Sequence, residues 1–390
     1  MQVQQIYSLM NTVTSEVLGE SAVVNEDLSN VVDIGTAVFN SNNVDNYVRS
    51  LVDHIGKVIF VNRPYTGSVP SVLMDGWEYG SVLEKIHADL PDATENESYE
   101  LESGASYDPN IFYKPSVAAK FFDHKVTFEV PMSFTERQVK ESFSSVTQLN
   151  GFISMLYNAI DKAMTVKIDG LIMRTINNMI GETMYAEYNS TSTFNNASHV
   201  KAVNLLYLYN HQFFGSSTSD YITDADALTD KAFLRYASYM MGVYSSRLSK
   251  MSTLFNIGGK PRFTPSDMLH VILHSDFAAA AKAYLYSDTY NEEFNRLPNA
   301  ELVPYWQGSG TGYAFTDTGA IKCTTTAGQT MTISGVLGVM FDRDALGVTN
   351  FDRRITTNYN AKAEFYNQWA KFDCGAFNDT NENFVVFFVA

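Results

Sequence analysis

Two histidines and a group of aspartates are the residues of this chain whose types and spacing come closest to a metal site. His270 and His274 are four residues apart, but the Val-Ile-Leu between them predicts a strand, and no further ligands lie near in the sequence. Asp224, Asp226 and Asp230 resemble half of a calcium loop, yet the required glycine and terminal glutamate are missing. We therefore expect a packed strand and an acidic cluster that leads into a helix, where carboxylates favour the helix N-terminus.

Glycine-rich and charged segments also fall short of a catalytic motif. Residues 308–312 (Gly-Ser-Gly-Thr-Gly) are neither a phosphate loop nor a nucleophile elbow, and Gly258-Gly259-Lys260 predicts a turn. A carboxylate pair for glycoside hydrolysis stays open, because acidic residues are plentiful and no spacing selects one. An ion-pair network is indicated by Asp342, Arg343, Asp344, Asp352, Arg353 and Arg354. We predict no catalytic, cofactor-binding or metal-binding residues, no cofactor and no enzymatic activity.

The amino-acid composition limits the kinds of partner that the chain can bind. The 390 residues carry a net charge of −16, which argues against tight nucleic-acid binding because phosphate contacts need clustered Lys and Arg. Charged residues make up 18 % and aromatics 13 %, a surface chemistry that suits contact with other proteins. Two cysteines, Cys323 and Cys374, fit a reducing cytoplasm. No apolar run reaches the length of a membrane span, and Met1 opens a polar segment, so we expect neither membrane insertion nor secretion.

One long helix, from Ser145 to Gly181, is the element that would organise the fold. Ser145 and Gln148 form a capping box, and Gly181 is placed to follow the helix end. At 1.5 Å per residue the helix is about 50 Å long, against a radius of gyration of about 21 Å for a compact chain of this size, so we expect an elongated, plate-like building block. Gly151 and Gly170 mark either two weak points of a core helix or places of bending or close approach. The apolar stripe consists of Leu149, Phe152, Ile153, Leu156, Ile160, Ala163, Met164, Ile168, Leu171, Ile172, Ile176, Met179 and Ile180.

Other elements flank this helix. An amphipathic helix is expected over 44–55 and a strand over 58–61, followed by an excursion over 63–123 whose acidic loop holds Asp92, Glu95, Glu97, Glu100 and Glu102. Alternation over 126–130 predicts a strand, and residues 133–136 predict the cap of a short helix. Beyond the long helix we expect a helix over 230–250, a strand over 269–273 that leads into a helix, and a central strand over 336–341. Residues 349–390 predict long strands with a final turn at 378–381.

These parts, in this order, resemble the HK97-type fold of tailed-phage capsid proteins, and more closely the major capsid proteins of small short-tailed phages of the phi29 type. The resemblance rests on residues 30–35 and 44–59, on 134–169, on Met340-Phe341-Asp342 and on the aromatic-rich segment 359–377. It implies an α+β fold in six parts. These are an N-terminal arm (1–41), a peripheral-domain entry helix and strand (42–62), an extended hairpin or E-loop (63–132), a peripheral domain with its spine helix (133–190), an axial domain (191–345) and strands that return to the peripheral domain (346–390).

The resemblance also implies a function. The chain is expected to be a major capsid protein that self-assembles into pentamers and hexamers of an icosahedral head around double-stranded DNA, without sequence-specific binding and without a membrane. The chain has neither the long N-terminal extension nor the immunoglobulin-like C-terminal domain of some relatives, so a separate scaffolding protein and a portal are expected as partners. Assembly would take place in the host cytoplasm and the product would be the virion. The alternatives that stay open are an encapsulin-like compartment shell, a tail or surface protein that binds glycans, and a glycoside-cleaving enzyme.

Overall fold

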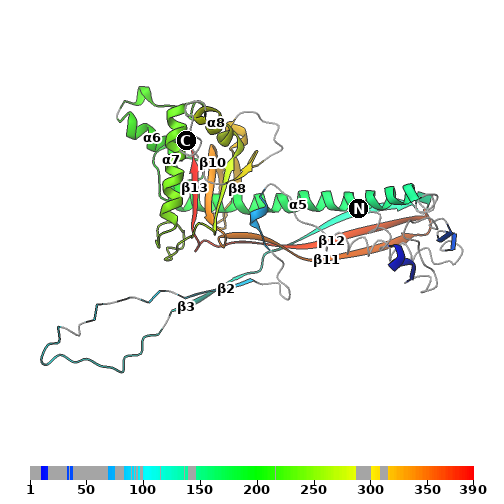
Figure 1. Cartoon of the computed structure of the whole chain (residues 1–390), viewed down its shortest axis with the longest axis horizontal. Helices are drawn as coiled ribbons and strands as arrows, with labels where there is room; N and C mark the ends of the chain where they lie inside the picture. The colour runs from blue at the N-terminus through cyan, green and yellow to red at the C-terminus, as the bar shows by residue number, and fades with distance from the viewer. Residues whose placement is uncertain are drawn as a thin grey trace. The chain divides into compact units, whose positions relative to one another are not determined.

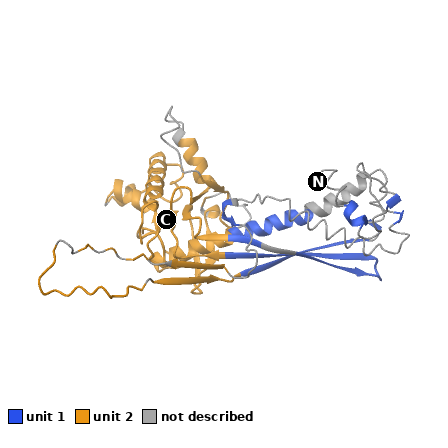
Figure 2. Cartoon of the chain, turned by 60° about the horizontal axis from the view of Figure 1, so that its bottom comes forward, with its two compact units in different colours: residues 1–78, 125–172, 348–376 blue, residues 79–124, 173–347, 377–390 orange. Residues whose placement is uncertain are grey.

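The computed structural model describes residues 10–15, 33–34, 36–37, 69–74, 83–88, 90–91, 93, 95–96, 100–114, 116–135, 137–138, 146–215, 217–286, 300–307 and 315–390. The chain divides into two compact units, which are 1–78, 125–172 and 348–376 for the first and 79–124, 173–347 and 377–390 for the second (Figure 2). The helix expected over 44–55, the strand expected over 58–61 and the glycine-rich segment 308–312 lie outside the described residues, as does most of the N-terminal arm.

The first unit contains a four-stranded sheet. Its order is β1 (Leu73–Met74), β11 (Leu346–Asn360), β12 (Phe365–Asn378) and β4 (Lys125–Thr135), although β11 begins and β12 ends just inside the second unit. A short 3-10 helix, η1 (Pro70–Val72), precedes β1. Strand β4 alternates between exposed and more buried side chains, which confirms the strand predicted over 126–130. It pairs antiparallel with β12 from Lys125 onward, so the sheet begins inside the region predicted as the E-loop.

Cross-strand pairs tie β4 to β12. Phe128 packs on Phe372 with ring centroids 5.7 Å apart, and Lys371 lies 3.3 Å from the Glu129 carboxylate. The predicted cap at 133–136 is wrong by two residues. Strand β4 runs to Thr135, whose Oγ1 accepts from the Gln138 backbone N–H while Gln138 Oε1 accepts from the Thr135 N–H, a reciprocal capping box.

The long helix is present as α5 (Val146–Tyr188), and it continues past the predicted end at Gly181 (Figure 1). Gly181 is not a cap, because it lies inside α5. A Cβ at this position would collide with Cys323 Sγ, so the glycine admits a close neighbour beside the helix. The helix ends instead at Asn189, which has a φ of 48° and donates its N–H to the Tyr185 carbonyl. A Cβ added at Gly170 would meet no atom within 4 Å, so close approach is not the reason for that glycine.

A five-stranded sheet forms the centre of the second unit. Its order is β5 (Ala202–Asn204), β13 (Phe384–Phe388), β10 (Val336–Asp342), β6 (Leu269–His274) and β7 (Glu301–Val303), with β10 antiparallel to both neighbours. All seven residues of β10 and all five of β13 are buried, which confirms the predicted central strand. The final strand, β13, therefore pairs within the second unit.

Three helices pack on this sheet and share one hydrophobic cluster with it: α6 (Leu205–Phe213), α7 (Lys231–Leu248) and α8 (Ser275–Tyr286) (Figure 1). Both the predicted helix near 230–250 and the predicted strand-to-helix unit near 269–275 are confirmed. The remaining short elements are η3 (Thr218–Asp220), α9 (Phe315–Thr318) and a hairpin of β8 (Ile321–Thr324) with β9 (Thr330–Ile333). Within the described part of the chain, no helix combines the length and apolar character that crossing a membrane requires.

Candidate assembly site

A two-stranded ribbon, β2 (Leu83–Ala88) with β3 (Val117–Phe122), stands at the base of the predicted excursion (Figure 1). The strands pair antiparallel, with Leu83 opposite Phe122 and Lys85 opposite Lys120. Because directly opposed residues share a face, the ribbon has two distinct sides. We call the side with Leu83, Lys85, His87, Ala118, Lys120 and Phe122 the inner face, and the side with Glu84, Ile86, Val117, Ala119 and Phe121 the outer face.

The inner face is held by a turn between β12 and β13. Asp379, on that turn, has no exposed side-chain surface; its Oδ2 lies 2.9 Å from Lys85 Nζ and its Oδ1 accepts from Lys120 Nζ at 3.0 Å. Lys85 Nζ also donates to the Asp344 carbonyl at 2.8 Å. Both lysines of the ribbon therefore meet one buried carboxylate.

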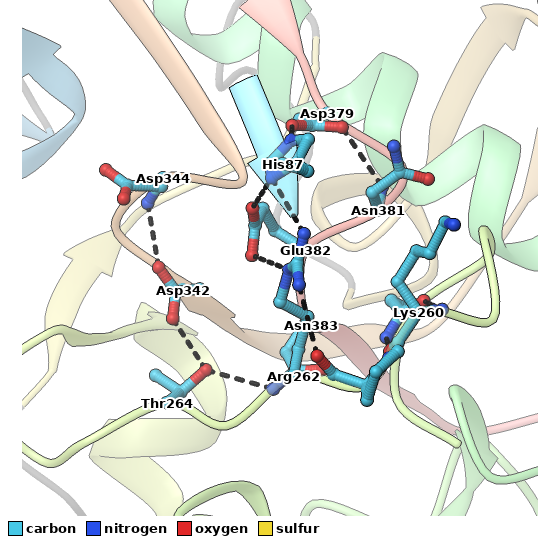
Figure 3. A network of polar contacts seen from close by, with 12 residues as sticks. His87, Lys260, Arg262, Thr264, Asp342, Asp344, Asp379, Asn381, Glu382 and Asn383 are labelled. Carbon is cyan, nitrogen blue, oxygen red and sulfur yellow. Dashed lines mark hydrogen bonds and ion pairs between the residues drawn. The ribbon is translucent and has the colours of Figure 1, made fainter. Parts of the chain in front are cut away.

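A second carboxylate and two more nitrogen groups complete the contact. Glu382 Oε2 lies 3.2 Å from Arg262 Nε, and its Oε1 lies 3.5 Å from Lys85 Nζ. Arg262 Nη2 lies 2.7 Å from His87 Nδ1, and because a guanidinium only donates, that nitrogen is the acceptor. We call Lys85, His87, Lys120, Arg262, Asp379 and Glu382 the anchor cluster, part of which Figure 3 shows. Phe122 adds apolar contact to it, with its ring centroid 5.2 Å from that of Phe377.

Local backbone geometry fixes the two carboxylates. The Asp379 N–H donates to the Ala345 carbonyl at 2.7 Å, and the Asn381 N–H donates to Asp379 Oδ1 at 3.1 Å. Gly258 lies directly against Asn381, where a Cβ would collide with the amide oxygen, so the predicted turn at 258–260 is packed against the carboxylate turn. Backbone hydrogen bonds and a glycine contact therefore hold the carboxylate turn against segments far from it in the sequence.

A buried relay supports the next residue of the turn. Thr264 Oγ1 donates to Asp342 Oδ2 at 2.7 Å and accepts from Asn383 Nδ2 at 3.1 Å, and Asp342 Oδ1 accepts from the Asp344 N–H at 2.9 Å (Figure 3). All three side chains of the relay are buried. Since a buried donor or acceptor without a partner is costly, this relay holds the turn in one conformation.

The anchor cluster does not fit a metal ion. His87, Asp379 and Glu382 each offer a ligand atom within 4.8 Å of the others. Lys85, Lys120 and Arg262 already neutralise the two carboxylates at 2.9 to 3.2 Å. A divalent ion at its usual ligand distance of about 2.0–2.6 Å would lie beside these three cations. The residues present serve as an internally neutralised anchor.

The electrostatics of Asp379 agree with this role. Burial by itself raises the pKa of the Asp379 carboxyl, but the hydrogen bond and charge of Lys85, with the Asn381 N–H and Lys120, outweigh it and hold the pKa below its ordinary 3.8. The group is therefore a carboxylate at neutral pH, paired with both strands of the ribbon.

The segment that connects the two strands has the opposite character. Every residue from 100 to 114 is exposed, including Phe112 at 84 % and Tyr113 at 82 %. Glu100, Glu102 and Asp108 add negative charge to this run. An exposed aromatic and acidic segment beyond an anchored base is suited to contact with another protein surface.

The residues that the sequence singled out as metal candidates have structural roles. His270 and His274 lie on β6, and burial lowers the pKa of both imidazoles, which fits packed, neutral rings. Asp230 caps α7 by accepting from the Phe233 N–H at 2.6 Å, as expected of a helix-leading acidic cluster. Among the described residues, the group with metal-ligating geometry contains neither His270 nor His274.

Two members of the predicted ion-pair network over 342–354 have partners outside it, and the side chains of Asp352 and Arg353 lie outside the described residues. Asp342 bonds to Thr264, whereas Arg354 Nη1 pairs with Asp373 at 2.7 Å. The anchor cluster was missed, because its members come from positions 85 to 382 and none of them forms a local motif. Two features of the sequence could have pointed to the cluster. They are the alternating basic residues Lys85 and His87 and the polar turn predicted at 378–381.

Comparison with known protein families gives a match along nearly the whole chain. The family model of the Phi29-like phage major capsid protein matches residues 10–388. The capsid structure of Staphylococcus phage Andhra is similar with 10 % identity and a TM-score of 0.49, covering 84 % of this chain and 86 % of that chain. The chain from the head fiber and inner core protein structure of bacteriophage P68 has 9 % identity, a TM-score of 0.49 and coverage of 85 % and 86 %.

A third similar structure is the asymmetric unit of the bacteriophage PhiM1 mature capsid, with 6 % identity, a TM-score of 0.40 and coverage of 84 % of this chain and 89 % of that chain. No curated protein matches the sequence. The family match therefore carries the assignment.

Proposed function

Because this chain belongs to the Phi29-like phage major capsid protein family, we propose that its copies join into a phage head through the segment that the anchor cluster holds at its base. Family membership makes it a structural protein of a phage capsid with the mixed α/β, HK97-type fold. The family match favours neither the encapsulin-like shell nor the glycan-binding protein as an alternative.

One observation supports the proposed mode of joining. The ribbon is bound to its own unit by two buried or nearly buried carboxylates, while residues 100–114 beyond it are all exposed. Exposed aromatic side chains such as Phe112 and Tyr113 add little stability to their own chain unless another surface covers them. We assign this segment as the E-loop, lying on an adjacent copy.

The domain plan extends this proposal. We keep the arm at 1–41, the peripheral-domain entry at 42–62 and spine-helix region at 133–190, the axial domain at 191–345 and the return strands from 346 as the functional parts of a shell subunit. The copies would form pentamers and hexamers of an icosahedral head, with a scaffolding protein and a portal as further partners. The head is assembled in the host cytoplasm around double-stranded DNA.

The deciding experiment removes Asp92–Tyr107 from the exposed segment. The shortened subunit keeps its helical circular dichroism, because the described residues of this segment lie in the solvent, and negative-stain images show few or no shells. The full chain gives shells under the same conditions. Loss of the helical signal on trimming would show that the segment belongs to the core and that the E-loop assignment is wrong.

The wall of the head is proposed to slide past DNA rather than bind it. With a net charge of −16 per subunit, repulsion exceeds attraction to phosphate, and a wall that gripped DNA would impede packaging. Unassembled subunits mixed with duplex DNA at low salt should therefore bind more weakly than about 1 μM. Tighter binding would contradict the sliding wall, and turnover of a glycan, ester or nucleotide that a single substitution abolishes would contradict the proposed absence of catalysis.

A further inference from the structure

Helix α7 packs on its own unit with one side and leaves the other side exposed. Arg235, Tyr239, Gly242 and Ser246, which follow one another at helical spacing, are all exposed and share one side of the helix. We call these four residues the α7 face. Tyr239 is its largest side chain and is 65 % exposed. The residues on the opposite side, all buried in the hydrophobic cluster of the unit, are Phe233, Leu234, Ala237, Met241, Tyr244 and Leu248.

Gly242 gives the α7 face a shape that its own chain does not use. The glycine lies inside the helix, where it is less favourable than alanine, and a Cβ added there would meet no atom within 4 Å. The distance between two packed helices depends on the side chains at their contact, so a glycine admits a close neighbouring backbone. Tyrosine, exposed here at Tyr239, is enriched at protein interfaces. This side of α7 is therefore suited to a second helix.

Positive charge is concentrated in this part of the chain. The 43 acidic residues of the chain outnumber its 27 basic ones, yet residues 231–266 contain Lys and Arg and no Asp or Glu. An acidic cluster at 224–230 precedes α7, so the surplus of positive charge lies toward the C-terminal end of the helix, where Arg247 and Lys250 are exposed. The helix dipole favours a cation at this end, but it explains neither the exposed tyrosine nor the glycine. The surface complements a negatively charged partner.

A second copy of this chain does not offer such a partner helix. Helices α6 and α7 contain no acidic residue, and the one acidic residue of α8, Asp276, accepts from Thr318 Oγ1 at 3.0 Å. The acidic residues of α5 are all partly buried; they are Asp161, Asp169, Glu182 and Glu187. Apart from the four-residue α9, no helix in the described part of the chain therefore presents an acidic side. Two α7 faces packed on each other would bring like charges together.

We infer that the α7 face binds a helix of a different protein, whose Asp or Glu side chains meet Arg247 and Lys250. This goes beyond the proposed function, which concerns contacts between copies of this chain. Duplex DNA suits the surface less well, because phosphate contacts need clustered Lys and Arg, whereas residues 236–246 carry no charge. The uncharged centre fits the packing of one helix on another.

Photocrosslinking identifies the partner. The photoreactive residue p-benzoylphenylalanine replaces Tyr239 on the α7 face or, as the control, Ala279 on the exposed side of α8, in subunits made in cells that produce the phage. Position 239 gives a covalent product with a different protein. Mass spectrometry reads the attached peptide, which contains Asp or Glu in a segment of helical periodicity. Position 279 does not give that product.

Two matched pairs of substitutions test the geometry of the contact. Gly242→Ala adds a methyl group where the partner backbone lies and lowers the yield of the product at least about fivefold, whereas Gly170→Ala leaves the yield unchanged. Lys250→Glu lowers it at least about tenfold, whereas Lys282→Glu, the same charge change on α8, does not. The urea unfolding of unassembled subunits changes little in all four variants, because every substituted position is exposed.

Several results would overturn the inference. They are a product that joins two copies of this chain, a crosslink to DNA, an attached peptide without acidic residues, and no product at position 239. An unchanged yield with Gly242→Ala and Lys250→Glu would do the same. None of these results depends on whether the unaltered chain builds shells, so the proposed function is tested separately.

Discussion

The central sheet of the second unit and the ribbon β2–β3 use apolar side chains in opposite ways. Strands β10 and β13 bury every residue, and their sheet shares one hydrophobic cluster with α6, α7 and α8. The ribbon buries charges against its own unit and leaves Ile86 and Phe121 in the solvent. The difference separates apolar side chains that the chain buries by itself from apolar side chains that it leaves exposed.

The largest expected effect compares a phenylalanine from each region. Phe387→Ala removes a fully buried ring from β13 and should lower the free energy of unfolding by about 3–5 kcal/mol. Phe121→Ala removes an exposed ring and should change it by no more than about 0.5 kcal/mol. Urea unfolding of unassembled subunits measures both. Similar losses at the two positions would erase the distinction between the regions.

The anchor cluster should come next in size. Asp379→Asn leaves Lys85 and Lys120 facing a neutral amide, and we expect a loss of about 1–3 kcal/mol, less than for a fully buried pair because both lysines keep some contact with solvent. Asp373→Asn is the control, since its partner Arg354 is half exposed and such pairs contribute about 0–1 kcal/mol. Limited proteolysis should cut the ribbon faster in the first variant only; equal rates would show that Asp379 does not anchor it.

Two glycines of α5 differ in how closely other parts of the chain pack against them, and substitution by alanine tests this difference. Gly181→Ala drives a methyl group into Cys323 Sγ and should cost about 1–3 kcal/mol, much of which the double variant with Cys323→Ala restores. Gly170→Ala meets open space and should stabilise the protein by about 0.5–1 kcal/mol. Thermal unfolding distinguishes the signs, and stabilisation by Gly181→Ala would contradict the packing reason for that glycine.

The smallest effect is a dependence on acid. The folded-state pKa of Asp379 lies below the ordinary 3.8, so its contribution is complete above that value and is lost as pH falls through the folded-state pKa. Proteolysis of the ribbon by an acid-tolerant protease should therefore accelerate as the pH falls below 3.8. The effect should be smaller than that of Asp379→Asn at neutral pH, and Asp379→Asn itself should show little of it. A rise that persists in that variant would assign the acid response to other carboxyl groups.

Periodicity predicted the regular elements well. The alternation over 126–130, the apolar run over 336–341 and the pattern over 230–250 each depend on neighbours within one element, and each is confirmed as β4, β10 and α7. The end of α5 was missed because Gly181 has two possible reasons, a cap or a close neighbour. The neighbour, Cys323, lies far along the chain, so the sequence near the helix does not reveal it.

The anchor cluster could not be predicted for a similar reason. Asp379 and Glu382 lie on a turn that composition alone made recognisable. Two of their cations, Lys85 and Lys120, are brought together by the pairing of β2 with β3, and the third, Arg262, comes from a separate segment. Asp342 and Arg354 were grouped because they are near in sequence, yet they bind Thr264 and Asp373. Proximity along the chain predicts secondary structure better than it predicts polar partners.

The distance along the chain between the two sides of the anchor cluster has a consequence for synthesis. Lys85 and Glu382 are 297 residues apart, so the ribbon emerges from the ribosome long before the carboxylates that hold it. At 5–20 residues per second this interval is about 15–60 s. During that time the ribbon is not yet fixed, and a nascent chain cannot present its outer face in the orientation that the finished subunit uses. The ribbon therefore takes up its final orientation only after the turn that carries Asp379 and Glu382 has been synthesised.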